Sequence, residues 1–136
     1  MKNLSLPLVF AVVACTTTAT PAMPSYLLDA SFEIGMARTV ADSCTKVSYQ
    51  AEDGTARQQA VAEQFVAEGR SADELQAWQS SDEYEAWARE RTVAYLEARG
   101  VDPNANIGAS EEEACKLADD EIAANSGVGK LLKKVK

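Results

Sequence analysis

Residues 28–44 read LDASFEIGMARTVADSC, and apolar side chains recur in this run at every fourth position. They are Leu28, Phe32, Met36, Val40 and Cys44. This spacing places all of them along one face of an α-helix, because such a helix turns once in about 3.6 residues. We expect a helix over residues 29–43, with the Cys44 thiol pointing inward at the end of the stripe.

The rest of the chain reads as helices separated by short breaks, and no segment shows sustained alternation with a period of two. A break is expected at residues 45–54, with Asp53-Gly54 as a turn signal. Further helices are expected at residues 55–68, from residue 72 to before residue 80, at residues 81–99, and at residues 110–124. Capping-box matches at Ser71-Glu74, Ser80-Glu83 and Ser110-Glu113 support the helix starts, and Gly69 and Gly100 support two of the helix ends. The pattern predicts an all-α fold, with about five short helices in one compact bundle.

Composition narrows the possible functions. The chain has 136 residues and a mass of 14.6 kDa, which suits one domain, and its formal net charge is −8. This acidic balance argues against nucleic-acid binding, which needs a basic surface. The lack of histidine removes Ser-His-Asp and Cys-His catalytic arrangements and imidazole zinc sites. We therefore expect neither an enzyme nor a bound cofactor.

The N-terminus is typical of an exported protein. Met1-Lys2-Asn3 is a short positive segment, and the apolar run Leu4–Val13 is too short to span a membrane. We expect residues 1–14 to be a signal peptide and residues 15–26 to be a flexible tether. Residues 27–136 then form the helical domain, with a short basic tail at its C-terminus.

The end of the signal peptide has two interpretations. The run Val12-Val13-Ala14-Cys15 resembles a bacterial lipobox, in which the cysteine becomes an acylated N-terminus. This interpretation predicts a lipid anchor on Cys15 and a lipoprotein held at the cell envelope. The alternative is ordinary cleavage after Ala14, Ala19 or Ala22, which would discard Cys15 or leave it free in a periplasmic protein.

Export also bears on the two cysteines of the domain. In an oxidising compartment Cys44 and Cys115 are free to pair. They would enclose about seventy residues, for which the loop-entropy model gives about 4 kcal/mol of stabilisation. A redox pair is the alternative, but the chain has neither Cys-x-x-Cys spacing nor a histidine to lower a thiol pKa. We predict a structural disulfide that ties the first and last helices of the domain together.

One loop between two expected helices matches part of a calcium-binding template. Oxygen-bearing side chains occupy template positions one, three, five, nine and twelve, namely Asp102, Asn104, Asn106, Ser110 and Glu113. Ile107 stands where the template needs glycine, and only the first and last of these ligands are charged. We therefore expect no metal, and we interpret the segment as a loop followed by a helix N-cap.

The C-terminal segment mixes lysines with aliphatic residues. Its centre is Lys130, Leu131, Leu132, Lys133 and Lys134, and no acid lies within it. One interpretation is an arm that contacts an anionic membrane or a partner protein. The other is a segment that packs its leucines and neutralises the acidic body with its lysines.

The longest expected helix carries an aromatic face that includes Tyr84, Trp87, Arg91 and Tyr95. This face could form a ligand slot with Arg91 as an anion clamp. We favour ordinary packing, with Arg91 snorkelling or stacked on a ring.

Several runs together resemble the domain of unknown function 5333 family. The resemblance covers about residues 32–132 and rests on ADSC (41–44), YLEARGVDP (95–103), Cys115, EIA (121–123) and SGVGKLL (126–132). It implies a small exported alphaproteobacterial protein with an all-α fold, a paired Cys44 and Cys115, and no catalytic residues. Genes of this family often lie among those for the proton-pumping NADH dehydrogenase, so the resemblance also implies an accessory role on the outer face of that complex.

These patterns together predict an exported, non-catalytic envelope protein that binds a partner protein. We expect it to be an accessory factor of a membrane complex such as the proton-pumping NADH dehydrogenase. The alternative is a helical module that binds a small molecule or an ion, through the aromatic face or the Asp102 loop.

Overall fold

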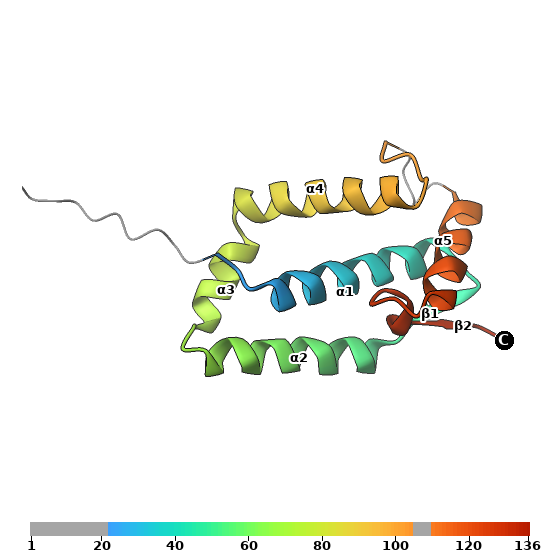
Figure 1. Ribbon diagram of the computed structural model, residues 1–136. Coiled ribbons are helices and arrows are strands. Elements are labelled where there is room, and N and C mark those ends of the chain that lie inside the picture. Colours follow the sequence, from blue (N-terminus) through green and yellow to red (C-terminus); the bar gives the residue numbers. More distant parts are fainter. Residues whose placement is uncertain (1–21, 105–109) are drawn as a thin grey trace, which may run out of the picture.

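A computed structural model describes residues 22–104 and 110–136 (Figure 1). The helices are α1 (Ser25–Ser43), α2 (Ala51–Ala67), α3 (Ala72–Gln79), α4 (Asp82–Ala98) and α5 (Glu111–Ala123). The short strands are β1 (Val47–Tyr49) and β2 (Leu132–Lys134), and β2 directly follows the 3₁₀-helix η2 (Gly129–Leu131). The predicted fold, a compact and mostly helical bundle with five α-helices, is confirmed, although the prediction lacked the strands.

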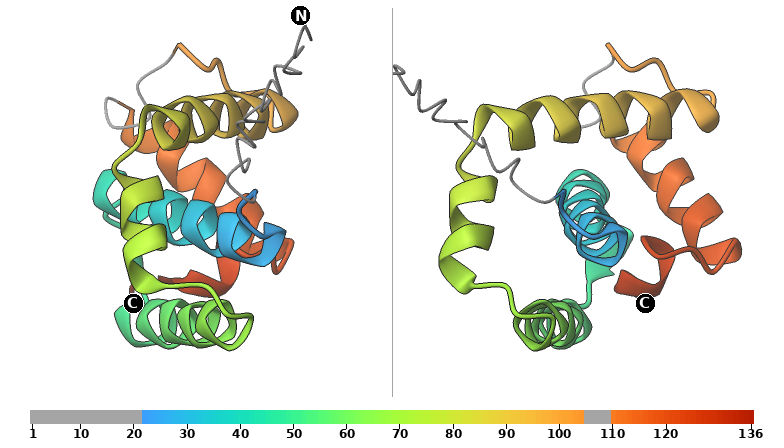
Figure 2. Two further views of the ribbon diagram at one scale, coloured as in Figure 1. Left: turned by 90° about the vertical axis from the view of Figure 1, so that its left-hand side faces the viewer. Right: turned by 60° about the vertical axis from the view of Figure 1, so that its left-hand side comes forward.

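Helix α1 runs through the middle of the molecule, and the other helices form a frame around it (Figure 2, right). Its apolar stripe is therefore only part of its buried surface. Leu27, Ala30, Ile34 and Ala37, which lie off the stripe, are also buried. A helix that contacts neighbours on several sides needs apolar residues on more than one face, so the single stripe was too narrow a prediction.

The start of α1 also differs from the expectation. The helix begins at Ser25 rather than at residue 29, so the last residues of the expected tether are helical. Two contacts hold this first turn in place. The Leu27 side chain is only 1 % exposed, and the Tyr26 hydroxyl donates a 2.8 Å hydrogen bond to Glu68 just after α2.

The strands β1 and β2 form a two-stranded antiparallel ribbon. Val47 lies opposite Lys134, and Tyr49 lies opposite Leu132. The ribbon brings the C-terminal segment back to the loop that follows α1 (Figure 1). The expected uninterrupted break at residues 45–54 is therefore wrong, because part of it is a strand.

The turn predicted at Asp53-Gly54 is also wrong. Helix α2 begins at Ala51, and Gly54 lies buried inside it. A β-carbon at Gly54 would collide with the hydroxyl of Tyr49 on β1. The glycine thus allows a close approach between strand and helix. In the sequence alone, the Asp-Gly pair resembles a turn.

The predicted disulfide is confirmed. It joins Cys44, just after α1, to Cys115 in α5, with the two Cα atoms 5.0 Å apart. Both cysteines belong to the main core, which α1, α4, α5 and the C-terminal segment build together. The C-terminal segment contributes Val128, Leu131 and Leu132 to this core.

Local signals set most of the helix ends. The hydroxyls of Ser71 and Ser110 each accept a hydrogen bond from a backbone N–H in the first turn of α3 and α5. Gly100 follows α4 with a φ of 69°, and the Val101 N–H donates to the Leu96 carbonyl at 2.9 Å, as in a Schellman motif. Within the described residues, every helix falls short of the length or the hydropathy that crossing a membrane requires.

Candidate interaction surface

Helices α3 and α4 meet at a corner that one serine hydroxyl organises. Ser81 Oγ accepts a 3.2 Å hydrogen bond from the Tyr84 N–H in the first turn of α4. The same hydroxyl donates to the Trp78 carbonyl in the last turn of α3. The N-cap of α4 is Ser81 and not Ser80, which the capping-box match had indicated, because Ser80 is the C-cap of α3. This link fixes the angle at which α3 meets α4.

The corner brings together aromatic rings from both helices. The ring centroids of Trp78 and Tyr84 are 4.9 Å apart, and Trp87 lies 5.5 Å from Trp78 and 5.6 Å from Tyr84. All three side chains are partly exposed, and none belongs to the main core. Helix α3 has no fully buried residue, so these rings are a principal contact of this helix pair. They form a separate cluster at the edge of the molecule.

A ligand slot between these rings is not compatible with their packing. The centroid distances are those of aromatic pairs in direct contact, so no molecule fits between two of the faces. Arg91, the candidate anion clamp, already has an acidic partner within the molecule. Arg91 forms a 2.6 Å ion pair with Asp29 of α1, and its guanidinium lies 4.8 Å from the centroid of the Phe32 ring. Arg91 is thus stacked on a ring, which is one of the two arrangements expected with ordinary packing.

The segment that carries the rings is rich in carboxylates. Residues 71–90 contain six acids and a single base, Arg89. Glu74 pairs with Arg70, whose hydrogen bond holds the pKa of the Glu74 carboxyl below its usual range. The other acids are exposed and form no ion pair within the described residues: Asp73, Asp82, Glu83, Glu85 and Glu90. We call these carboxylates together with Trp78, Tyr84 and Trp87 the acidic aromatic corner.

The corner also contains a surface hollow of about 500 Å³. Trp78, Asp82 and Glu83 line part of it, and Met23 from the segment before α1 lines another part. An aromatic residue and acidic residues therefore line the same hollow. Such a surface suits a ligand with both apolar and positively charged groups.

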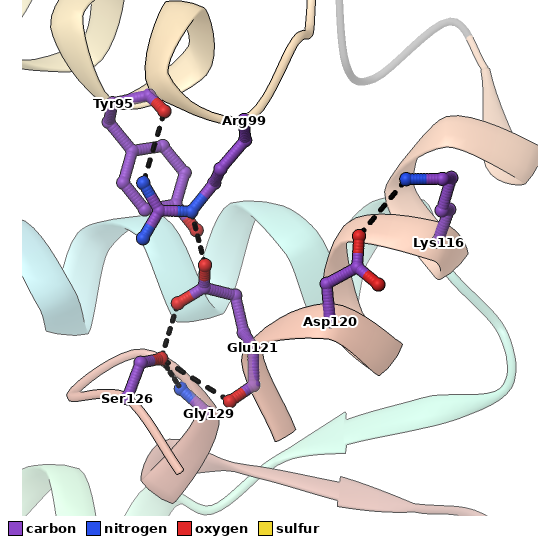
Figure 3. Close-up of polar contacts among 7 residues, drawn as sticks. All are labelled: Tyr95, Arg99, Lys116, Asp120, Glu121, Ser126 and Gly129. Carbon is purple, nitrogen blue, oxygen red and sulfur yellow. Dashed lines mark hydrogen bonds and ion pairs between the residues drawn. The ribbon is translucent and has the colours of Figure 1, made fainter. Parts of the chain in front are cut away.

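A second polar cluster lies inside the molecule, around Glu121 of α5 (Figure 3). The Glu121 side chain is only 3 % exposed, yet Arg99 and Ser126 both donate hydrogen bonds to its carboxylate. The Gly129 N–H in turn donates to Ser126 Oγ at 2.9 Å. The cluster therefore ties the end of α4 to α5 and to the C-terminal segment. A buried carboxylate needs such partners, because an unpaired one would be strongly destabilising.

Tyr95 completes this cluster. The Arg99 guanidinium lies 3.6 Å from the centroid of the Tyr95 ring and donates to the Tyr95 carbonyl at 3.1 Å. Burial, and then the negative charge of Glu121, raise the pKa of the Tyr95 hydroxyl well above its usual value. The hydroxyl is buried and has no hydrogen-bond partner in the described part of the chain. It stays protonated at physiological pH, and the cluster acts as a structural link.

Sequence reasoning missed the Glu121 cluster, although a signal was present. Glu121 lies three residues after Ala118, on the face of α5 that also carries Cys115. An acid on an otherwise apolar helix face needs a cation nearby, and Arg99 supplies it.

The calcium-loop candidates are placed as parts of an ordinary loop and cap. Asp102 Oδ1 accepts a 2.9 Å hydrogen bond from the Asn104 N–H, and Ser110 Oγ accepts one from the Glu113 N–H. Asn106 lies outside the described residues. No cluster of three or more acidic or cysteine residues with metal-binding geometry occurs in residues 22–104 and 110–136.

The residues proposed for partner or membrane contact divide into two groups. Leu131 and Leu132 are 3 % and 6 % exposed, so they pack into the core. Lys130, Lys133 and Lys134 are exposed, and Lys134 forms a 3.0 Å ion pair with Asp119 of α5. These positions agree with a segment that packs its leucines and offsets acidic charge. Contact of the lysines with a partner or a membrane stays a prediction.

The signal peptide at residues 1–14 and the lipidation candidate Cys15 lie outside the described residues. They too stay predictions.

Comparison with known proteins identifies the family. A family model described as a family of unknown function, DUF5333, matches residues 23–133. The chain belongs to the DUF5333 family. This match spans every described helix, β1, the first two residues of β2 and the disulfide, so the fold described above is that of a DUF5333 domain. No curated protein and no solved structure matches the chain.

Proposed function

We propose that this DUF5333 protein is an exported, non-catalytic protein that binds a partner protein. In this proposal it serves as an accessory factor of a membrane complex such as the proton-pumping NADH dehydrogenase. The observation that carries the proposal is the acidic aromatic corner. Its three rings lie partly exposed and apart from the main core, and tryptophan and tyrosine are the residues that most often dominate binding energy at protein interfaces. The choice of complex rests on the usual gene neighbours of the family.

Export is part of the proposal. Disulfides persist in oxidising compartments, and a Cys44–Cys115 bond inside the main core agrees with folding outside the cytoplasm. Residues 1–14 supply the signal peptide, and a lipid on Cys15 would anchor the protein at the envelope. Mass spectrometry of the mature N-terminus tests the anchor. An acylated Cys15 supports it, whereas an unmodified N-terminus after Ala19 or Ala22 would contradict it.

The buried polar groups support a non-catalytic role. Glu121 is paired with Arg99 and Ser126, and burial moves the pKa of the Tyr95 hydroxyl further above the physiological range. These side chains hold helices together and lie away from the surface hollow. The corner, in contrast, presents rings and carboxylates that can bind but that do not include a nucleophile paired with a base.

Co-purification tests the function. The full-length protein, tagged at its C-terminus, is isolated from membranes solubilised in a mild detergent, and its Cys15→Ser variant is isolated in parallel. We expect a stoichiometric protein partner with both chains, because binding through the folded domain does not depend on the anchor. A small ligand retained on an isolated monomer would favour the alternative of a ligand-binding module. An isolated protein with neither would refute the proposal.

A further inference from the structure

We propose that the acidic aromatic corner binds a segment rich in lysine and arginine on the partner protein. This inference rests on the proposed function and adds to it a location and a partner chemistry. The occupant is an exposed basic stretch of polypeptide, lying across Trp78 and the hollow beside it, with its cations directed at Asp82 and Glu83.

Charge supports this choice of occupant. The five exposed carboxylates of the corner have no ion pair among the described residues, whereas Asp29 and Glu33 of α1 and Asp119, Asp120 and Glu121 of α5 each have one. An uncompensated patch of one sign attracts the opposite sign and raises the rate of encounter. Anionic lipid and nucleic acid carry the same sign as the corner, so electrostatics disfavours both.

The rings support it independently of the carboxylates. An ammonium or guanidinium group gains energy when it lies over the face of an aromatic ring, and tryptophan is the best such ring. The molecule already uses this contact internally, since Arg91 lies 4.8 Å from the centroid of Phe32 and Arg70 lies 4.7 Å from that of Phe65. Arg91 also lies 5.9 Å from the centroid of Trp87, so that ring already has a cation beside it, whereas the partly exposed Trp78 ring lies next to the hollow and has no cation over it among the described residues.

Shape and charge together match a side chain with a long apolar stem and a charged head. The hollow next to Trp78 measures about 500 Å³, and its lining combines apolar atoms of Met23 with the carboxylates of Asp82 and Glu83. A lysine or arginine stem packs on the apolar part while its head reaches the carboxylates. A neutral apolar ligand would leave those carboxylates without partners.

The sequence provides a direct probe of this surface. The chain contains two tryptophans, Trp78 and Trp87, and both lie in the corner. Intrinsic tryptophan fluorescence of the full chain therefore reports on this surface alone. The probe is a synthetic peptide of alternating arginine, lysine and leucine without aromatic residues, and the matched peptide has glutamate in place of every cation. We expect the basic peptide to change the emission saturably, more weakly at high salt, and the acidic peptide to leave it unchanged.

Charge reversal tests the location. The variant D82K/E83K reverses two acids in the first turn of α4, and we expect it to weaken peptide binding about fivefold or more. The matched control is E52K/D53K, which reverses two acids in the first turn of α2. The control changes the net charge equally and disturbs a helix start equally, so we expect it to retain the affinity within about twofold. If D82K/E83K unfolds, the neutral variant D82N/E83Q is compared with E52Q/D53N, which changes the net charge by the same amount.

Three outcomes would overturn the inference. They are no saturable change in fluorescence with the basic peptide, equal binding of the acidic peptide, and equal weakening in both reversal variants, which would indicate attraction by net charge alone. Failure of the proposed function is seen separately. If a partner co-purifies equally with D82K/E83K, the proposed function is retained but the corner is not its binding site. If no partner co-purifies with the unaltered protein, the proposed function is refuted, whatever the result with the peptide.

Discussion

Removal of the Cys44–Cys115 bond should destabilise the whole domain. The bond closes a loop with a sequence separation of 71 residues. For a loop of this length, the chain-entropy model gives about 4 kcal/mol of stabilisation, and the loss of native bridges from small secreted domains is about 2–5 kcal/mol. We expect the C44A/C115A variant to lose an amount within this range. The bridge lies inside the main core, so the substitution also removes packing there, and the upper half of the range is favoured.

Urea unfolding followed by far-UV circular dichroism measures the change. With a slope of about 2 kcal/mol/M, a loss of 4 kcal/mol lowers the midpoint by about 2 M. Reduction of the unaltered protein with dithiothreitol isolates the cross-link from the packing change, and Cys15→Ser is the matched control with an intact bridge. We expect reduction to account for most of the loss and the control to be unchanged. An unaltered midpoint after complete reduction, or ready alkylation of both thiols in unreduced native protein, would refute a stabilising bridge.

Further predictions concern single sites. Gly35→Ala should raise stability by about 0.5–1 kcal/mol in thermal melts, because this exposed position in α1 has free space around it and alanine favours a helix. Gly129→Ala should instead lower stability by about 2 kcal/mol or more, because its β-carbon would collide with the backbone at residue 121. Calcium at millimolar concentration should leave the Tm unchanged, since only binding to the native state raises it; a rise that Glu113→Gln abolishes would show a real site. The hydrogen bonds from Thr45 hold the pKa of Glu111 below its ordinary 4.5. Stability linked to this group is therefore present above that pH and is lost as the pH falls through the native pKa, and Thr45→Val should make the loss shallower in urea midpoints measured against pH.

Much of the helical framework could be predicted because its signals are local. A serine cap, a glycine after the last turn or a four-residue apolar spacing involves residues within one or two turns of one another. The ends of α3, α4 and α5 were accordingly predicted to within about two residues. The disulfide was also within reach, because export leaves Cys44 and Cys115 as the natural pair.

The missed features depend on contacts between distant parts of the chain. Ser48 of β1 lies opposite Lys133 of β2, 85 positions later, and no local pattern in these three-residue strands indicates such a pairing. Gly54 reads as a turn residue until the Tyr49 ring is seen beside it. Position in the fold thus changes the meaning of a residue that local propensity describes correctly in isolation.

The acidic aromatic corner was predictable only in part. Both tryptophans and the acids around them are visible in the sequence, but they belong to two helices separated by a short break. Their association depends on the angle between α3 and α4, which the Ser81 hydroxyl sets through bonds to both helices. Sequence analysis could thus provide the residues of the surface but not the surface itself.

The β1–β2 ribbon has a consequence for the time at which this protein can fold. Its second strand, Leu132–Lys134, pairs with β1 across a separation of 85 positions at Ser48 and Lys133, so synthesis must reach residue 134 before the ribbon closes. The core cannot be completed earlier, because Val128, Leu131 and Leu132 belong to it. The pairing joins distant parts of the sequence, and such long-range closure is slow. Slow closure of this kind suits the export proposed above, because a polypeptide crosses a membrane more readily before its tertiary structure has formed.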